Sequence, residues 1–348
     1  MAPAMLTLLL LTLGLGTTVT FASSHWLVAW MGLEINTLAI LPLMARRHHP
    51  RAVEATTKYF LIQVTGAALL LFAACSNAWL TGEWDIKQSD STYATTMAMT
   101  GLALKLGLAP MHVWLPEVLQ GLDLSIGLIV STWQKLAPLI LLIQVTPSDS
   151  KLLIILGVAS TLLAGWAGLN QTQVRKILAY SSIAHLGWMV VVLQFSFALT
   201  LLTLLIYSVM TISAFLIFNM NKTTTINAVG ISWAKSPAIT ALAPLILLSL
   251  GGLPPLTGFM TKWLILQELT KQDLAPLATL AALSALLSLY FYLRLSYSLT
   301  LTMSPNNITG TSPWRLTSPK HTLSTATFTM ATILLLPLTP AIAALLVQ

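Results

Sequence analysis

Charged residues are scarce in this chain of 348 amino acids. Only 8% are Asp, Glu, Lys or Arg, whereas soluble domains contain about 25%. Hydrophobic residues make up 56% of the chain, and a water-soluble surface cannot be built from that composition. A helix needs about 20 mostly apolar residues to cross a bilayer, and a backbone in lipid must satisfy its own hydrogen bonds. The composition therefore predicts an all-α integral membrane protein.

Cysteine and cofactor-binding motifs are also scarce. Cys75 is the only cysteine, which excludes an intramolecular disulfide, a CxxC cluster for an iron–sulfur centre and a CxxCH haem site. The sequence contains neither a GxGxxG motif after a strand pattern nor a Walker loop. Its His, Cys, Asp and Glu residues are not spaced as metal ligands. We therefore expect no nucleotide, redox cofactor or metal in this chain.

Apolar length, together with breaks at Gly, Pro and charged residues, predicts eleven transmembrane spans. The first is expected to be a span and not a targeting peptide, because it has no basic n-region and no clear cleavage site. A short apolar helix at 111–120 follows the fourth span, and the ninth span is too long for one straight crossing. Both irregularities predict broken helices. The expected spans are 3–21, 26–43, 59–80, 93–108, 124–145, 152–169, 174–193, 198–218, 237–269, 274–295 and 323–347.

The positions of the two predicted breaks indicate an internal repeat. One lies at 106–110 in the fourth span and the other at 251–255 in the ninth, five spans later. Because five is odd, the two copies are inverted. We expect one membrane domain, 1–348, made of five-helix repeats at 1–145 and 146–299 and a final helix at 300–348. Corresponding interrupted spans indicate a transport site near the midplane, although Gly and Pro could also merely kink packed helices.

Basic residues favour one side of the predicted bundle. With the N-terminus inside, nine Lys and Arg residues fall in inner loops and three in outer loops. This positive-inside bias predicts an inner N-terminus. The topology explains the net charge of +7, so no nucleic-acid partner is expected. The inner set is Arg46, Arg47, Arg51, Arg175, Lys176, Lys222, Lys235, Arg315 and Lys320, and the outer set is Lys87, Lys151 and Lys271.

Several ionisable residues lie inside predicted spans, where a charge costs at least about 2.5–3.5 kcal/mol and usually lines a polar pathway. Lys135 is about eleven residues, or about 16 Å, from either end of its span, too deep for its ammonium to reach the interface. Burial lowers the pKa of an amine, which permits proton exchange near neutral pH. Alternatively, Glu34 and Lys105 could form a fixed ion pair, and His185 could be a hydrogen-bonded core histidine. The candidate proton-relay residues are Glu34, Lys105, Lys135, His185 and Lys262.

Three segments resemble the antiporter-like subunits of respiratory complex I. They are KLGLAPMHVWLPE at 105–117, QVRKILAYSSIAHLGW at 173–188 and GLPPLTGFMTKW at 252–263. The resemblance covers essentially the whole chain and implies inverted five-helix repeats with a row of buried charges. It implies that Glu34 is the first-channel glutamate, Lys105 its paired lysine, Lys135 the central lysine and Lys262 the distal lysine. His185 is similar to a connecting polar group.

The same resemblance implies the function. The chain would translocate protons as a subunit of NADH:ubiquinone oxidoreductase, without a redox centre or direct NADH binding. Its partners would be the other membrane subunits of complex I and the lipid bilayer, and it would lie in the mitochondrial inner membrane with its N-terminus on the matrix side. The family's three N-terminal helices have no counterpart here, which resembles the shortened form in animal mitochondria. A stand-alone cation/proton antiporter and a structural scaffold remain alternatives.

Overall fold

The computed structural model describes residues 3–46, 49–87, 91–145, 151–234, 236–301 and 322–347. The regular secondary structure of this part of the chain is helical, joined by turns and loops, with isolated backbone bridges and no strand. The chain divides into two compact units, Met1–Leu156 and Gly157–Gln348. We refer to these as unit 1 and unit 2 and describe each by itself.

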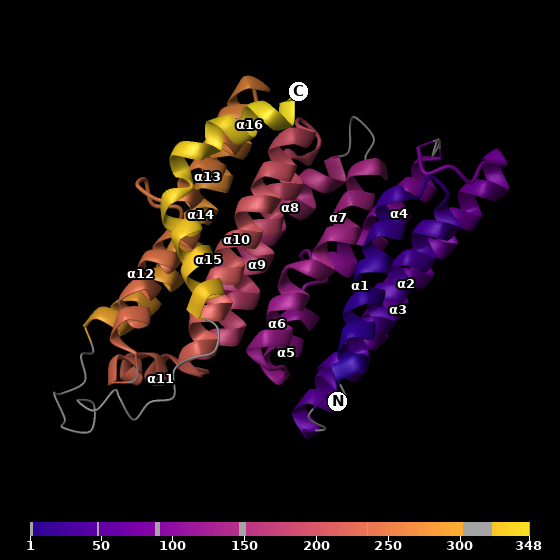
Figure 1. Cartoon of the computed structure of the whole chain (residues 1–348). Coiled ribbons are helices and arrows are strands. Elements are labelled where there is room, and N and C mark those ends of the chain that lie inside the picture. Colours follow the sequence, from indigo (N-terminus) through magenta and orange to yellow (C-terminus); the bar gives the residue numbers. More distant parts are fainter. Residues whose placement is uncertain are drawn as a thin grey trace. The chain divides into compact units, whose positions relative to one another are not determined.

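In unit 1, α1 packs against α2, α2 against α3 and α3 against α4, and these helices run alongside one another in Figure 1. Close approach of α3 and α4 depends on facing glycines, because a Cβ on Gly101 would lie 3.1 Å from the Gly66 carbonyl oxygen. Helix α7 packs against α1, α2 and α4. The helices are α1 (Pro3–Ala22), α2 (Trp26–Met44), α3 (Pro50–Thr81), α4 (Thr92–Leu106), α5 (Trp114–Gly121), α6 (Leu124–Ser131) and α7 (Trp133–Val145).

Unit 2 is built around α9, which is buried at nearly every position and contacts α10, α13 and α14. Helix α8 (Lys151–Gly168) crosses the boundary between the units. The other elements are α9 (Val174–Leu193), α10 (Phe197–Asn221), α11 (Ile226–Gly230), η1 (Ile231–Ala234), α12 (Pro237–Gly251), α13 (Thr257–Lys271), α14 (Ala275–Thr300), α15 (Thr322–Leu334), η4 (Leu336–Leu338) and α16 (Thr339–Val347).

With α6 and α7 counted together as one span, the described residues contain eight helical segments long and apolar enough to cross a membrane. There are nine if the segments on either side of a 64° bend near the C-terminus form one span. The other two expected spans are the interrupted ones. The fourth is α4, with only 15 residues, and the ninth is divided into α12 and α13, with 15 residues each. The structure therefore supports an all-helical, multi-pass membrane fold, while the count of eleven stays a prediction.

Both interrupted spans end at a glycine in the left-handed conformation. Gly107 after α4 has φ +79° and Gly252 after α12 has φ +78°, a region where a side chain is strained. The next N–H bonds back to the helix in each case, from Leu108 to the Ala103 carbonyl over 2.9 Å and from Leu253 to the Leu248 carbonyl over 3.2 Å. This is the Schellman arrangement of a helix C-terminus. The helices thus end where the sequence predicted breaks.

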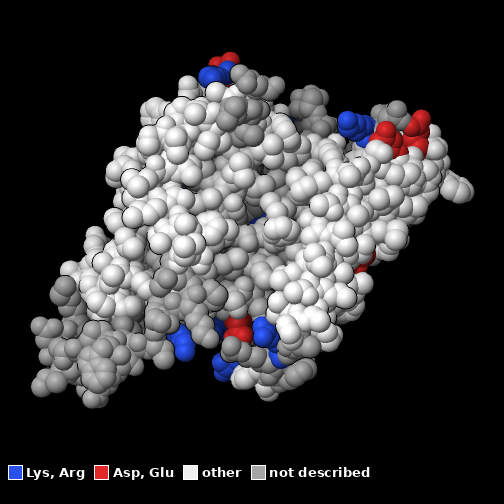
Figure 2. Space-filling view, in the orientation of Figure 1, with Lys and Arg blue, Asp and Glu red and all other residues white. Residues whose placement is uncertain are grey.

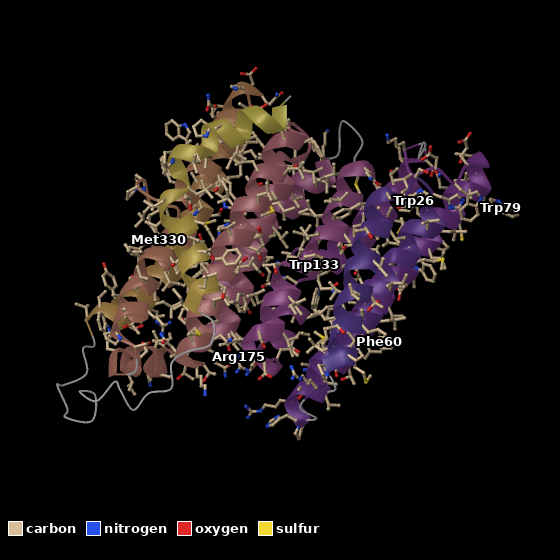
Figure 3. The ribbon with its side chains drawn as sticks, in the orientation of Figure 1. Trp26, Phe60, Trp79, Trp133, Arg175 and Met330 are labelled. Carbon is tan, nitrogen blue, oxygen red and sulfur yellow. The ribbon has the colours of Figure 1, made fainter. Side chains whose placement is uncertain are left out.

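The outer surface of both units suits a lipid environment. Charged side chains in view gather near helix ends, and the surface along the helices is almost free of charge (Figure 2). Large apolar side chains lie exposed along the helices, and Trp79 near the end of α3 is 90% exposed (Figure 3). Aromatic side chains are enriched at the edges of the bilayer.

Candidate functional site

A carboxylate and an ammonium meet inside unit 1. Glu34 lies in the middle of α2, and Lys105 lies in the last turn of α4. Glu34 Oε1 and Lys105 Nζ are 3.6 Å apart, and the Lys105 side chain is 1% exposed. Thr37 donates from Oγ1 to the Glu34 backbone carbonyl over 2.9 Å and also lies 3.3 Å from Glu34 Oε2. The carboxylate is therefore held on α2 while it faces the lysine of the broken helix.

Lys135 lines the same internal cavity as Lys105. The cavity has a volume of about 10 Å³, which is about the smallest that holds a water molecule. Lys135 is 3% exposed and lies in the first turn of α7. The cavity is also lined by Asn36, Thr37, Tyr59, Gln63, Trp114 and Gln134. The structure thus gathers Glu34, Lys105 and Lys135 in one polar region of unit 1.

Sequence reasoning missed three amides near these lysines, of which Asn36 and Gln63 are buried and Gln134 is half-buried. Gln63 donates from Nε2 to the Lys105 carbonyl oxygen at 3.4 Å, and Gln134 donates to the Asn36 carbonyl oxygen at 3.2 Å. Asn36 is 2% exposed, and neither of its side-chain polar atoms has a hydrogen-bond partner among the described residues. Only ionisable residues were selected from the sequence, although a buried amide also indicates a polar pathway.

His185 and Lys262 lie in unit 2, on α9 and α13, two helices that pack against each other. His185 is 8% exposed, and its ring centroid lies 5.5 Å from that of Tyr207. Lys262 donates from Nζ to the carbonyl oxygen of Gly251, the last residue of α12, over 2.6 Å. Unsatisfied carbonyls at a helix C-terminus carry partial negative charge. The end of α12 therefore acts as a counter-charge for Lys262, as Glu34 does for Lys105.

Gly252 makes room for this arrangement. A Cβ at Gly252 would lie 2.8 Å from Lys262 Cδ and 3.1 Å from Lys262 Nζ. A side chain at this position would therefore displace the lysine as well as strain the backbone.

No group of three His, Cys, Asp or Glu residues in the described part of the chain could hold a metal ion. The two candidate residues of unit 2 supply an imidazole and an amine.

The family of the chain follows from its match to known proteins. Residues 23–288 match the NADH:quinone oxidoreductase/Mrp antiporter transmembrane family, and residues 289–343 match the C-terminus of NADH dehydrogenase subunit 2. The chain belongs to the NADH:quinone oxidoreductase/Mrp antiporter family. All five candidate residues lie within the first matched region. The resemblance seen in the sequence is thereby confirmed at the level of the family.

Individual relatives match over almost the whole chain. NADH-ubiquinone oxidoreductase chain 2 of Tetraodon nigroviridis is 68% identical over 342 residues, covering 98% of each chain. The protein of the same name from Gadus morhua is 64% identical over 346 residues, covering 99% of each. A chain of respiratory complex I from Thermus thermophilus with bound aureothin superposes with a TM-score of 0.83 at 28% identity, covering 97% of this chain and 78% of that one.

Proposed function

We propose that this chain translocates protons as a membrane subunit of an NADH:ubiquinone oxidoreductase whose redox centres lie in other subunits. Family membership and the relatives named NADH-ubiquinone oxidoreductase chain 2 support the assembly. The observation that carries proton translocation is the pairing of Glu34 with Lys105, which lines the same cavity as Lys135. Buried ionisable groups beside such a cavity are typical of proton relays in membranes.

The proposed mechanism in unit 1 is electrostatic. Opposite unit charges about 4 Å apart attract by about 4 kcal/mol at an effective dielectric of about 20, so Glu34 favours the ammonium form of Lys105. A charge or conformational change elsewhere in the complex that weakens this pair releases the proton toward Lys135. Like charges about 7 Å apart repel by about 2 kcal/mol at the same dielectric, which moves the proton onward. Lys262 exchanges the proton with the outer side.

The inverted repeats at 1–145 and 146–299, followed by the helix at 300–348, are part of this proposal. The left-handed glycines Gly107 and Gly252 support them, since each begins the pattern Gly-Leu-X-Pro and the two are 145 positions apart. The same spacing relates Glu117 of α5 to Lys262 of α13. Both broken helices are therefore followed by an ionisable residue at the same step.

Backbone bonds at the second helix of each proposed repeat agree with that correspondence. In each repeat, the first residue of the second helix donates its backbone N–H to a carbonyl oxygen in the loop that follows the third helix. The acceptor is the third residue of that loop in both repeats. The fifth residue after the third helix donates its own N–H in the opposite direction. Its acceptor is the carbonyl oxygen of the residue two positions before the second helix. The bonds are Trp26 N to Trp84 O (3.1 Å), Ile86 N to Ser24 O (2.9 Å), Val174 N to Thr224 O (3.0 Å) and Ile226 N to Thr172 O (3.1 Å).

The assembly is tested by native gel electrophoresis of solubilised membranes, followed by mass spectrometry. We expect peptides of this chain in a very large band that oxidises NADH. The two alternative functions predict other results. A stand-alone antiporter would migrate by itself. A structural scaffold would stay in the large band but would tolerate loss of its buried lysines. Migration of the chain by itself would overturn the respiratory assignment.

The proposed location is the mitochondrial inner membrane, with eleven spans and the N-terminus on the matrix side. The excess of basic residues in one set of loops supports this orientation. The exposed Cys75 is first replaced by serine. A cysteine introduced at the exposed Arg51 should then react with an impermeant maleimide only from the matrix side, and one at the exposed Glu83 only from the opposite side. The reverse labelling pattern would show that the orientation is wrong.

A further inference from the structure

Four buried hydroxyl groups lie in unit 2 near the residues proposed to carry protons. Tyr207 on α10 and Tyr292 on α14 are each 1% exposed, and Ser181 and Ser182 on α9 are fully buried. Burying a hydroxyl costs free energy unless it finds a hydrogen-bond partner. Ser181 donates to the Leu178 carbonyl over 2.8 Å, so its own hydroxyl is satisfied within α9.

His185 on α9 lies beside Tyr207 on α10. The rings of His185 and Tyr207 have centroids 5.5 Å apart and planes inclined by 43°. Ser182 and Tyr292 both lie near the Tyr207 hydroxyl group. Ser182 donates its own proton to the Ala179 carbonyl over 2.7 Å.

Tyr292 lies beside the glycine whose carbonyl oxygen binds Lys262. The Tyr292 ring packs beside Gly251, since a Cβ on that glycine would lie 3.7 Å from Tyr292 Cδ2. The Gly251 carbonyl oxygen is the acceptor for Lys262 Nζ at 2.6 Å. The Tyr292 side chain also faces Ser181, yet its hydroxyl makes no hydrogen bond within the described residues. A buried, unsatisfied hydroxyl at this place is ready to bind water or pass a proton.

We propose that Tyr207 and Tyr292 relay protons between His185 and Lys262 within unit 2. In each step, a phenol oxygen accepts a proton from one side while its own proton passes to an acceptor on the other side. One O–H bond forms as another breaks, so neither ring keeps a net charge. This inference rests on the proposed function, because it requires His185 and Lys262 to exchange protons.

The test replaces each tyrosine by phenylalanine, which keeps the ring and removes only the hydroxyl. In vesicles containing the assembled complex, Tyr207→Phe and Tyr292→Phe should each lower the initial rate of NADH-driven proton release by at least about fivefold. Tyr290→Phe and Tyr297→Phe are matched controls, because both lie on α14 and are 58% and 57% exposed. Their rates should equal that of the unmodified complex.

A second readout separates a relay from a packing role. Proton release by the two buried variants should show a larger solvent deuterium isotope effect than the controls, whereas a packing defect leaves that effect unchanged. Rates at the control level in both variants, or reduced rates with an unchanged isotope effect, would overturn the relay. The variant Lys262→Met distinguishes this failure from failure of the proposed function. If the Lys262→Met complex also releases protons at the normal rate, the hypothesis that Lys262 exchanges protons is itself wrong. If one phenylalanine variant does not assemble, the other decides alone.

Discussion

Replacing Lys135 with methionine is expected to lower NADH–quinone turnover per assembled complex by at least about tenfold, since it removes a proton-transfer group. Methionine preserves much of the side-chain length but carries no ionisable amine. Lys135 is 3% exposed and lines the cavity that Lys105 also lines, so the substitution removes the proton carrier from this region. Turnover is measured as NADH–quinone oxidoreduction in vesicles, normalised to the amount of assembled complex on native gels.

The arginine variant distinguishes a relay from a fixed positive charge. Lys135→Arg keeps the charge but holds its proton, because the pKa of arginine exceeds about 12. A relay therefore predicts low turnover in both variants, whereas a charge needed only for packing predicts rescue by arginine. Lys271→Met serves as the matched control, since that lysine lies at the end of α13 with a side chain 61% exposed. Its turnover should stay normal.

Replacing Glu34 with glutamine is expected to lower NADH-driven proton release at least about fivefold while the complex still assembles. Glutamine has the same shape as glutamate but no charge, so the Lys105 ammonium loses the carboxylate now 3.6 Å away. Without this counter-charge, Lys105 no longer loads its proton for transfer to Lys135. The measurement is the initial rate of proton release, with the amount of assembled complex determined in parallel.

A static ion pair predicts a different result for the same variant. Breaking a buried pair by removing one partner usually destabilises the fold strongly. Loss of assembly, with normal activity in each complex that does assemble, would therefore point to a structural pair. Glu54→Gln is the control, because Glu54 pairs with Lys58 at the exposed start of α3 and its side chain is 62% exposed. Exposed pairs of this kind contribute about 0–1 kcal/mol.

Most helices could be predicted from apolar length, and both breaks from glycine and proline. The prediction at 174–193 coincides with α9, and that at 3–21 differs from α1 by one residue. The interruption between α6 and α7 was missed, because no glycine or proline stands there. Its residues Ser131 and Thr132 both donate their hydroxyls to the Leu128 carbonyl, over 3.0 and 2.7 Å. Such bonds compete with the backbone and bend helices.

The candidate site was only partly predictable for a related reason. A charge inside a span is rare and costly, so Lys135 and Glu34 could be selected from the sequence alone. Amides and hydroxyls are common in spans, and nothing local distinguishes Gln63 or Tyr292 from their many counterparts. Only packing shows that Gln63 bonds the Lys105 carbonyl and that Tyr292 lies beside the glycine that binds Lys262.

The initial rate of NADH-driven proton release from vesicles that contain the assembled Lys135→Met complex tests proton conduction through this chain most directly. Conduction through the buried lysines predicts a rate at least about tenfold below that of the unmodified complex, with the Lys271→Met complex unaffected. The same rate in Lys135→Met and unmodified complexes would contradict proton conduction through Lys135 and would favour a scaffold.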